Sequence, residues 1–437
     1  MRRFILEQSN DEIYTSHSGL ALVGLCLNRY AEVNKTLRKA IPLRHDAFFR
    51  RSLGIRKMPS APRLRQRFDE YASEMLPVVY ANTIDFLVNA KVPVSPLATG
   101  HVALDIDVFP MDNSGTMKEG VSRTYKGYDG YAPIAAYLGQ EGWCLANELR
   151  EGRQHSQNEF RYTLERVLPN ARRLTDAPLL VRLDGGHDAL ETRGILASEQ
   201  ADFILKWNPR QQDPEAWMAR VPADTAWECP RPGKRVATFS VYEQQRWQGQ
   251  DYRFRRVMRV TERTIDRHGQ ILLMPQIDID GWWTTLDEAE HPDATIIALY
   301  RDHATSEQFH SDKSTWSRFG RTACARRVGT REGAHPFKTD LDIERLPSGK
   351  FATNDLIMSL AAYSYNILRW IGLIGLLGDI SPLRHPAKRR RLRTVIQELM
   401  YRAARVIRSG RRWTLRFSAH CPAYQAFRLT YQYLAYG

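Results

Sequence analysis

Two stretches of the sequence place carboxylates near the ends of predicted buried strands. Residues 102–108 alternate between apolar side chains on one face and Asp105 and Asp107 on the other. Residues 179–184 form an apolar run that ends in Asp184 and is followed by two glycines. Glycines beside an acidic strand end allow a ligand to approach the backbone closely. We therefore expect carboxylate oxygens at two strand ends where a bound ligand can reach them.

A third carboxylate, Glu307, follows the apolar and β-branched run 295–300. This run predicts a buried strand. We expect Thr305 or Ser306 to be the N-cap of a following helix, which would then have Glu307 in its first turn. A carboxylate in that position lies at the positive end of the helix and at the edge of the sheet.

The order Asp, Asp, Glu on two strands and one helix predicts a site for two Mg²⁺ ions. Mg²⁺ prefers carboxylate oxygens and retains several of its waters. Two such ions can stabilise the attacking and the leaving oxygen of a phosphoryl transfer. The chain has 49 acidic residues, so a solvated strand or loop end is the competing interpretation of each aspartate taken alone.

The spacing around Glu307 resembles the Tyr-x2-Arg-x3-Glu-x6-Lys signature of one branch of the DDE transposases of bacterial insertion sequences. Tyr300 and Glu307 match that spacing. Asp107 resembles the first catalytic aspartate of the family, with Asp105 as the alternative, and Asp184 resembles the second. The resemblance extends over nearly the whole chain. Further similar segments are 59–67, 122–139 and 344–355.

Two positions depart from the signature. His303 stands where the family has arginine, and the expected lysine is displaced. Leaving out residues 313–336 places Lys338 seven residues after Glu307 and restores the pattern, so we interpret 313–336 as an inserted basic loop. The resemblance implies that Tyr300, His303 and Lys338 contact DNA phosphate. Histidine, however, cannot form the bidentate contact of arginine.

The resemblance also implies an activity. A transposase of this branch catalyses metal-dependent cleavage and strand transfer at the inverted-repeat ends of its element, with Mg²⁺ as cofactor and Mn²⁺ as a substitute. Its partners are the transposon ends and the target DNA, and it acts as a homodimer that pairs two ends. Two other interpretations stay open: a decayed copy that binds DNA without cutting it, and a ribonuclease-H-like nuclease unrelated to transposition.

Basic residues are concentrated towards the two ends of the chain. The net charge is +14 overall, with +6 in residues 1–100, −4 in 101–380 and +12 in 381–437. An acidic middle between basic ends suits a metal site flanked by segments that hold a polyanion. We expect DNA contacts from arginines at the start of a helix predicted after Ser60 and from the first basic cluster of the C-terminal region. These expected contact residues are Arg63, Arg65, Arg67, Lys388, Arg389, Arg390 and Arg391.

The overall pattern predicts an α/β protein with a ribonuclease-H-like catalytic core. Alternating strands and helices extend over residues 101–380, with a β-rich insertion at 208–293 and the extra basic loop at 313–336. A helical DNA-binding region, 1–100, precedes this core, and a basic helical region, 381–437, follows it.

The C-terminal region predicts two helices. The first follows the basic cluster and carries Val395, Leu399, Ala403 and Val406 on one apolar face. The second is an aromatic-rich helix near the end of the chain. Both helices belong to the region that we expect to hold DNA.

Three features bear on the cellular location. The run 356–378 has the length of a membrane span, but it contains Arg369 and is the single such segment, so it predicts a buried helix. The five cysteines form no CxxC pair, which favours a reducing compartment. The first residues lack the pattern of a signal peptide. We expect a cytoplasmic, nucleoid-associated protein that does not contact the membrane.

Overall fold

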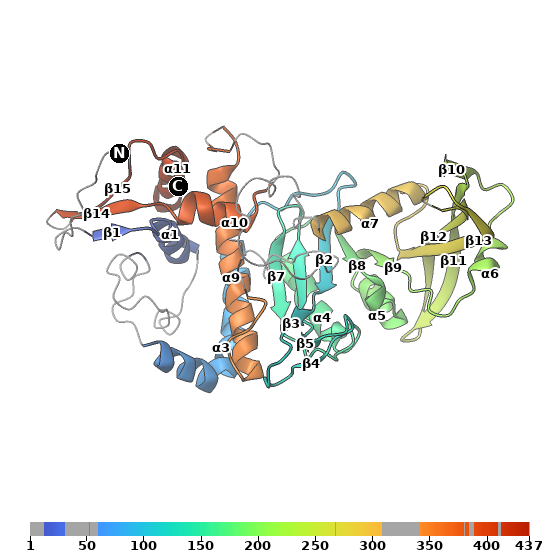
Figure 1. The fold of residues 1–437 in the computed structure, drawn as a ribbon, viewed down its shortest axis with the longest axis horizontal. Coiled ribbons are helices and arrows are strands. Elements are labelled where there is room, and N and C mark those ends of the chain that lie inside the picture. Colours follow the sequence, from blue (N-terminus) through green and yellow to red (C-terminus); the bar gives the residue numbers. More distant parts are fainter. Residues whose placement is uncertain are drawn as a thin grey trace.

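The computed structural model shows an elongated molecule with three parts. The first and the last described elements of the chain lie together on one side, a helix-flanked sheet occupies the middle, and a long β-ribbon forms the other side (Figure 1). The structure describes residues 13–30, 52, 60–266, 268–307, 341, 343–379, 381–383, 389–409 and 412–436, and it describes the side chains of all of these except 13, 14, 61 and 303–307.

Five short apolar strands form one end of a nine-stranded sheet, which confirms the predicted α/β class. Their order is β9-β8-β2-β6-β7; β8 runs parallel to β2 and to β9, whereas β6 and β7 form an antiparallel extension. Nearly all residues of β2 and β8 are buried, as expected for strands covered on both faces. These strands are β2 (Val102–Val108), β6 (Ile134–Leu138), β7 (Trp143–Glu148), β8 (Leu179–Leu183) and β9 (Asp202–Lys206). A separate small sheet follows β2 and contains β3 (Met111–Asp112), β4 (Ser122–Arg123) and β5 (Asp129–Tyr131).

Two helices connect the parallel strands and cover one face of the sheet. Helix α4 (Phe160–Arg172) leads from β7 to β8, and α5 (Leu190–Ser198) leads from β8 to β9. The buried residues of α4 recur every three or four positions, so one side of this helix packs on the apolar cluster of β2 and β8.

Residues 295–300 belong to a helix, so the strand predicted there is wrong. Helix α7 (Asp293–Glu307) packs its buried apolar residues against the face of β8 and β9 that α4 does not cover. The predicted N-cap is also wrong, because Thr305 and Ser306 lie inside α7 and Glu307 is its last residue. A six-residue apolar run fits a buried strand and a buried stretch of helix equally well, so its periodicity could not separate the two.

The predicted β-rich character of residues 208–293 is confirmed. Strands β11, β12 and β13 are long and antiparallel, and β10 lies at their outer edge. β13 also pairs with β9 through Trp282–Thr284, so the ribbon continues the central sheet and projects beyond it (Figure 1). The ribbon consists of β10 (Trp227–Arg231), β11 (Lys234–Trp247), β12 (Gln250–Ile265) and β13 (Ile271–Thr284), and a short helix, α6 (Pro214–Met218), precedes it.

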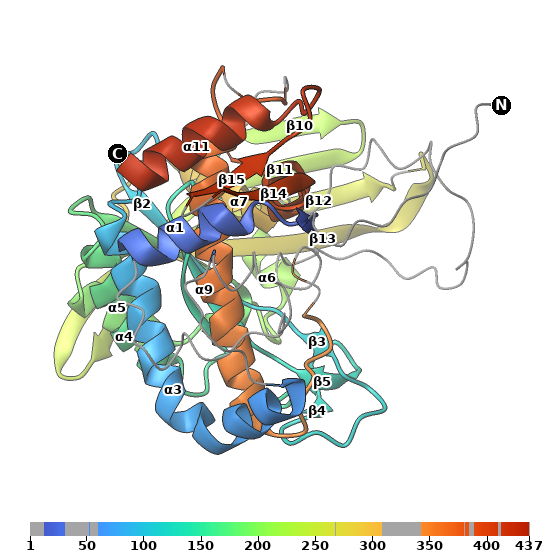
Figure 2. The same ribbon diagram turned by 90° about the vertical axis from the view of Figure 1, so that its left-hand side faces the viewer.

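Two long helices, α3 (Ala61–Asn89) and α9 (Phe351–Leu376), lie side by side (Figure 2), and both contact β7. Helix α3 begins after Ser60 with a proline in its first turn, as predicted. Helix α9 is largely buried, which confirms the buried helix predicted for 356–378. Within the part of the chain that the structure describes, no helix combines the length and the hydropathy of a membrane span.

The flanking regions contain helices, as predicted, but they also share a three-stranded sheet that was not predicted. β1 (Ile13–Thr15) pairs with β14 (Ala404–Ser409), which forms a hairpin with β15 (Arg412–Arg416). The helix predicted to continue through Ala403 and Val406 therefore ends earlier. In β14 the buried side chains alternate with less buried ones, which is the period of a strand. The other terminal elements are α1 (Leu20–Tyr30), α10 (Leu392–Val395), a π turn (Ile396–Met400) and α11 (Tyr424–Tyr436).

Asp355 of α9 is a buried carboxyl group that faces β7. Its Oδ1 accepts a hydrogen bond from the backbone nitrogen of Leu149 at 2.9 Å. The pKa of Asp355 is raised to about 7, mainly by burial and in part by the nearby Glu148, against the opposing effects of that hydrogen bond and of Arg166. The folded state therefore holds this proton more tightly than the unfolded state does.

This raised pKa predicts that stability falls as the pH rises. The free energy of unfolding is expected to decrease by at most about 4 kcal/mol between about pH 4 and pH 7, because the unfolded chain loses the proton first. Urea titrations across this range test the prediction. Asp355→Asn retains an acceptor for Leu149 and should lose this contribution to the pH dependence; a variant with the same pH dependence as the unaltered chain would contradict it.

Candidate active site

Asp107 and Asp184 occupy neighbouring positions at the ends of two parallel strands. Ile106 of β2 lies opposite Leu183 of β8, so the next residue of each chain segment is one of the two aspartates. Neighbouring strands are about 4.8 Å apart, a separation at which two carboxylates can share a cation. Asp107 is half-buried, and 47% of the Asp184 side chain is exposed. The sheet therefore brings together two residues that the sequence predicted separately.

The alternative first aspartate, Asp105, is neutralised inside the protein. Arg182 of β8 donates from Nε to Oδ1 at 2.6 Å and from Nη2 to Oδ2 at 2.7 Å. Both side chains are buried. The remaining Arg182 nitrogen, Nη1, donates to the backbone carbonyl of Leu299 in α7 at 2.8 Å. This bidentate ion pair ties β2, β8 and α7 together, which is a structural role for Asp105.

Asp184 begins a tight turn that orients its carboxylate. Its Oδ1 accepts hydrogen bonds from the backbone nitrogen of Gly186 at 3.1 Å and from Nδ1 of His187 at 2.7 Å. His187 is fully buried, and its ring lies 4.2 Å from that of Phe160. A Cβ atom at Gly186 would lie 2.9 Å from the Ser156 hydroxyl, so this turn favours glycine. The sequence analysis missed the positioning role of His187, for which the spacing Asp-Gly-Gly-His was the available signal.

Helix α7 is anchored at two points along its length. Near its start, Asp293 accepts hydrogen bonds from Nη2 of Arg255 at 2.5 Å and from the Ser240 hydroxyl at 2.6 Å, both on the ribbon. Further along, Leu299 accepts the hydrogen bond from Arg182 of β8. The helix therefore runs from the ribbon towards the strands that carry the two aspartates.

The ring of Tyr300 in α7 contacts Trp282 of β13, with 6.1 Å between the two ring centroids. Glu307 follows seven residues later, which is about two helical turns, so both positions lie on the same face of α7. Helix α7 thus passes from the ribbon to β8, the strand that Asp184 follows. Outside the described part of the structure lie the side chains of His303 and Glu307, residues 313–336, Lys338 and Lys388.

The described carboxylates are of the kind that binds divalent cations. Asp107 and Asp184 offer oxygen donors at adjacent strand ends, and Mg²⁺ prefers such donors. Among the described side chains, no group of three His, Cys, Asp or Glu is arranged to hold a metal ion. Because the side chain of Glu307 lies outside that set, the predicted trio of carboxylates stays a prediction.

The arginines expected to contact DNA form two groups. The three on the first turns of α3 are exposed. Those before α10 contact the protein itself: Nε of Arg390 donates to the Leu376 carbonyl at 2.9 Å, and burial lowers the pKa of Arg389 to about 10. Arg391 is half-buried. A role in DNA binding stays a prediction for both groups, and the exposed group is Arg63, Arg65 and Arg67.

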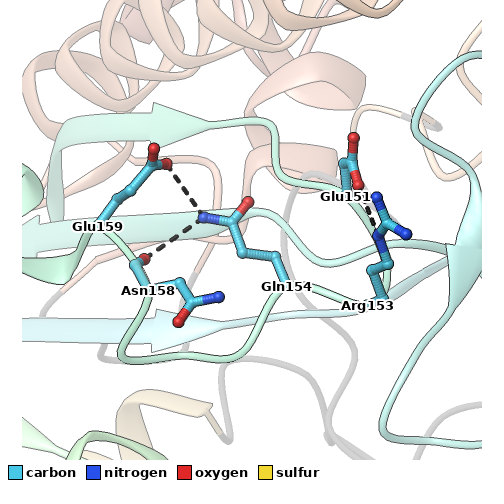
Figure 3. Close-up of a pocket in the computed structure, with 5 residues that line it drawn as sticks. All are labelled: Glu151, Arg153, Gln154, Asn158 and Glu159. Carbon is cyan, nitrogen blue, oxygen red and sulfur yellow. Dashed lines mark hydrogen bonds and ion pairs between the residues drawn. The ribbon is translucent and has the colours of Figure 1, made fainter.

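An open pocket of about 610 Å³ is formed by the segment between β7 and α4 (Figure 3). In its wall, Nε of Arg153 donates to Glu151 at 3.0 Å, and Gln154 donates to Glu159 at 3.2 Å. The lining is polar and carries both signs of charge. None of the residues predicted to be catalytic lines this pocket, and its lining residues are Glu151, Arg153, Gln154, Asn158 and Glu159.

The fold and the site define a mixed α/β protein with adjacent acidic residues at the ends of parallel strands. The family model for transposase DDE domain group 1 matches residues 4–330, and the chain belongs to this family of DDE transposases. That match includes Asp107, Asp184 and Glu307, and it confirms the predicted transposase class.

The other comparisons are less informative. No curated protein matches the chain. Among solved structures, the piggyBac transposase in a synaptic complex with hairpin DNA is similar over 88% of this chain and 68% of that chain, with 11% sequence identity and a TM-score of 0.33. We draw nothing further from a likeness at this level.

Proposed function

We propose that this chain cleaves DNA at the inverted-repeat ends of a bacterial insertion sequence and joins the freed ends to target DNA. The family supports a transposase. The observation that carries the proposal is the adjacency of Asp107 and Asp184 at the ends of parallel β2 and β8. Glu307, the last residue of α7, completes the proposed Asp-Asp-Glu set.

A ribonuclease-H-like arrangement of the central sheet is part of this proposal. The order β9-β8-β2-β6-β7 supports it, because the antiparallel strands β6 and β7 follow β2 in the chain and the parallel strands β8 and β9 come after them. In this arrangement two acidic residues end neighbouring parallel strands, and the third comes from the helix that covers them.

We assign Asp107, rather than Asp105, as the first metal ligand. Asp105 already has both oxygens bonded to Arg182, and displacing that arginine would leave a buried charge without compensation. Gly186 and His187 hold Oδ1 of Asp184, which orients this carboxylate before any ligand binds. The proposed site therefore has one ligand on each of two rigid strands.

Two Mg²⁺ ions, or Mn²⁺ in their place, would supply the activation of the attacking hydroxyl and the stabilisation of the leaving 3′ oxygen. The residues of the chain position these ions and the DNA strand. Tyr300, His303 and Lys338 are proposed to contact DNA phosphate near the cut. The exposed arginines of α3 and the basic end regions are proposed to hold the flanking duplex. We further propose a homodimer that pairs two ends, in the cytoplasm and associated with the nucleoid.

The direct test is nicking of a duplex that carries the element's own inverted-repeat end. We expect the intact chain to nick this duplex in the presence of Mg²⁺, and we expect Glu307→Gln to abolish nicking, because it removes one negatively charged ligand. A scrambled duplex of the same length is the control for sequence recognition. Equal cutting of both duplexes would favour a nuclease unrelated to transposition.

A decayed copy that binds DNA without cutting it is the second candidate. The basic segment 313–336 and the histidine at position 303 favour it, because both interrupt the signature around Glu307. A variant that lacks 313–336 separates the two candidates. If the intact chain binds the end duplex but does not nick it, and the deletion variant does nick it, this copy has lost cleavage through its insertion.

A further inference from the structure

A cluster of two cations and one carboxylate lies beside the proposed catalytic aspartates. Nζ of Lys206 is 2.5 Å from Oδ1 of Asp280, and Nη2 of Arg259 is 2.6 Å from Oδ2 of the same group. Two positive charges thus share one negative charge. The cluster retains a net positive charge, with further N–H donors on both cations.

The register of the sheet places this cluster next to Asp184. Leu183 of β8 lies opposite Leu205 of β9, so Asp184 and Lys206 are the next positions of the two parallel strands. Asp107, Asp184 and Lys206 therefore follow one another across the same edge of the sheet, about 4.8 Å apart from strand to strand.

Lys206 and Asp107 also share one face of the sheet. Leu205 and Ile106 belong to the apolar cluster on the α4 side, whereas Ile204 belongs to the cluster under α7. Side chains alternate along a strand, so Lys206 and Asp107 are on the α7 side. The Lys206 side chain thus lies on the same face of the sheet as the proposed catalytic Asp107.

The Trp282 ring makes cation–π contacts with both Lys206 and Arg259. Nζ of Lys206 lies 4.2 Å from a Trp282 ring centroid, and Cζ of Arg259 lies 5.3 Å from one. Trp282 is buried, and its ring also contacts Tyr300 of α7. Cation–π contacts of this kind favour a fixed position of the charged groups. The cluster is therefore joined to the helix that carries Glu307.

Both cations are partly open to solvent. The exposed fractions of the Lys206 and Arg259 side chains are 25% and 22%. Such a position allows a ligand to reach the nitrogens, while partial burial strengthens their electrostatic attraction. Burial lowers the pKa of Lys206, and its bond to Asp280 opposes this change.

We propose that Lys206 and Arg259 form a phosphate-binding site that holds the DNA strand next to the scissile bond. This inference rests on the proposed function. Where the signature has an arginine on the helix, this chain has His303, which is a weaker phosphate ligand. Lys206 and Arg259 supply positive charge from the sheet instead, and Trp282 joins them to Tyr300 of the same helix.

The ribbon offers a matched control for this site. Arg263 and Asp278 form the same kind of ion pair, at 2.7 Å, between the same two strands. Arg263 lies four residues after Arg259, and Asp278 lies two residues before Asp280. Because the two strands are antiparallel, both are further from the end of the ribbon that joins β9. Arg263→Gln thus removes one charge from the same ribbon face without touching the proposed phosphate site.

The experiment measures binding of the end duplex by the full chain in EDTA over a series of salt concentrations. Lys206→Gln and Arg259→Gln are each expected to weaken binding about tenfold and to reduce the salt slope by about one. Lys206→Arg should retain most of the affinity. The stability of each variant is checked by thermal unfolding, and Asp280 keeps one cationic partner in each single variant.

A modified duplex locates the contact. Methylphosphonate in place of the phosphates next to the cut should weaken binding by the unaltered chain and should have little further effect on Lys206→Gln. The inference is overturned if Lys206→Gln and Arg263→Gln behave alike, or if the methylphosphonate effect is unchanged in Lys206→Gln. In either case, specific nicking by the unaltered chain would leave the proposed function standing.

Discussion

Asp184→Asn is expected to lower the rate of Mg²⁺-dependent nicking by about 10³-fold, which corresponds to about 4 kcal/mol of transition-state stabilisation. Asparagine retains an oxygen that can accept the hydrogen bond from Gly186, so the turn should persist. It removes the negative charge that a divalent cation requires. Binding of the end duplex in EDTA should change by less than about threefold, because no phosphate contact is lost.

Asp213→Asn is the matched control for this substitution. Asp213 also stands before a short helix and accepts a hydrogen bond from the backbone nitrogen two residues later, at 3.0 Å from Glu215. It lies away from the proposed site. The assignment of Asp184 would be wrong if both variants nicked the duplex equally well.

The same assay decides between the two candidates for the first aspartate. Asp107→Asn should reduce nicking as strongly as Asp184→Asn does, with unchanged thermal stability. Asp105→Asn should act mainly on stability, because it weakens the buried pair with Arg182. Loss of nicking in Asp105→Asn at unchanged stability, together with an active Asp107→Asn, would reverse our assignment.

Arg182→Met is expected to decrease the free energy of unfolding by about 3–5 kcal/mol. The substitution leaves the Asp105 carboxylate buried without its cation and removes the hydrogen bond to Leu299. The contact between α7 and the sheet should weaken as a consequence. Urea denaturation followed by circular dichroism measures the change.

A double variant separates the lost charge pair from a loss of packing. Arg182→Met combined with Asp105→Leu should recover a large part of the stability, because no buried charge is then left unpaired. Arg172→Met is the matched control: its partner is Glu199 on the surface, with 42% and 50% of the two side chains exposed. This control should cost less than about 1 kcal/mol. Equal effects of Arg182→Met and Arg172→Met would refute the structural role of the buried pair.

Much of the candidate site could be predicted because its signals are local. The alternation in 102–108 marks Asp105 and Asp107 as residues of one strand face, and the apolar run before Asp184 marks a strand end. Both strands form where they were predicted. Tyr300 and Glu307 lie about two turns apart on one helix, α7, although residues 295–300 were predicted to form a strand.

The errors arose where a local pattern fits two structures. The apolar run 295–300 has no period that distinguishes a strand from a buried helix. In the structure it forms a helix because it packs against β8 and β9. Similarly, the spacing of Ala403 and Val406 fits a helix face. Pairing of β14 with β1 at the other end of the chain decided for a strand.

By itself, the sequence determined the family and the class of fold, and it supplied the candidate metal ligands as a prediction, because all of these depend on residue types at short spacing. Only the tertiary structure decided which of them act together. Arg182 pairs with Asp105, and Lys206 lies beside Asp184, because β8 pairs with β2 on one side and with β9 on the other. Such neighbours are set by hydrogen bonds between strands far apart in the chain, so no local pattern records them.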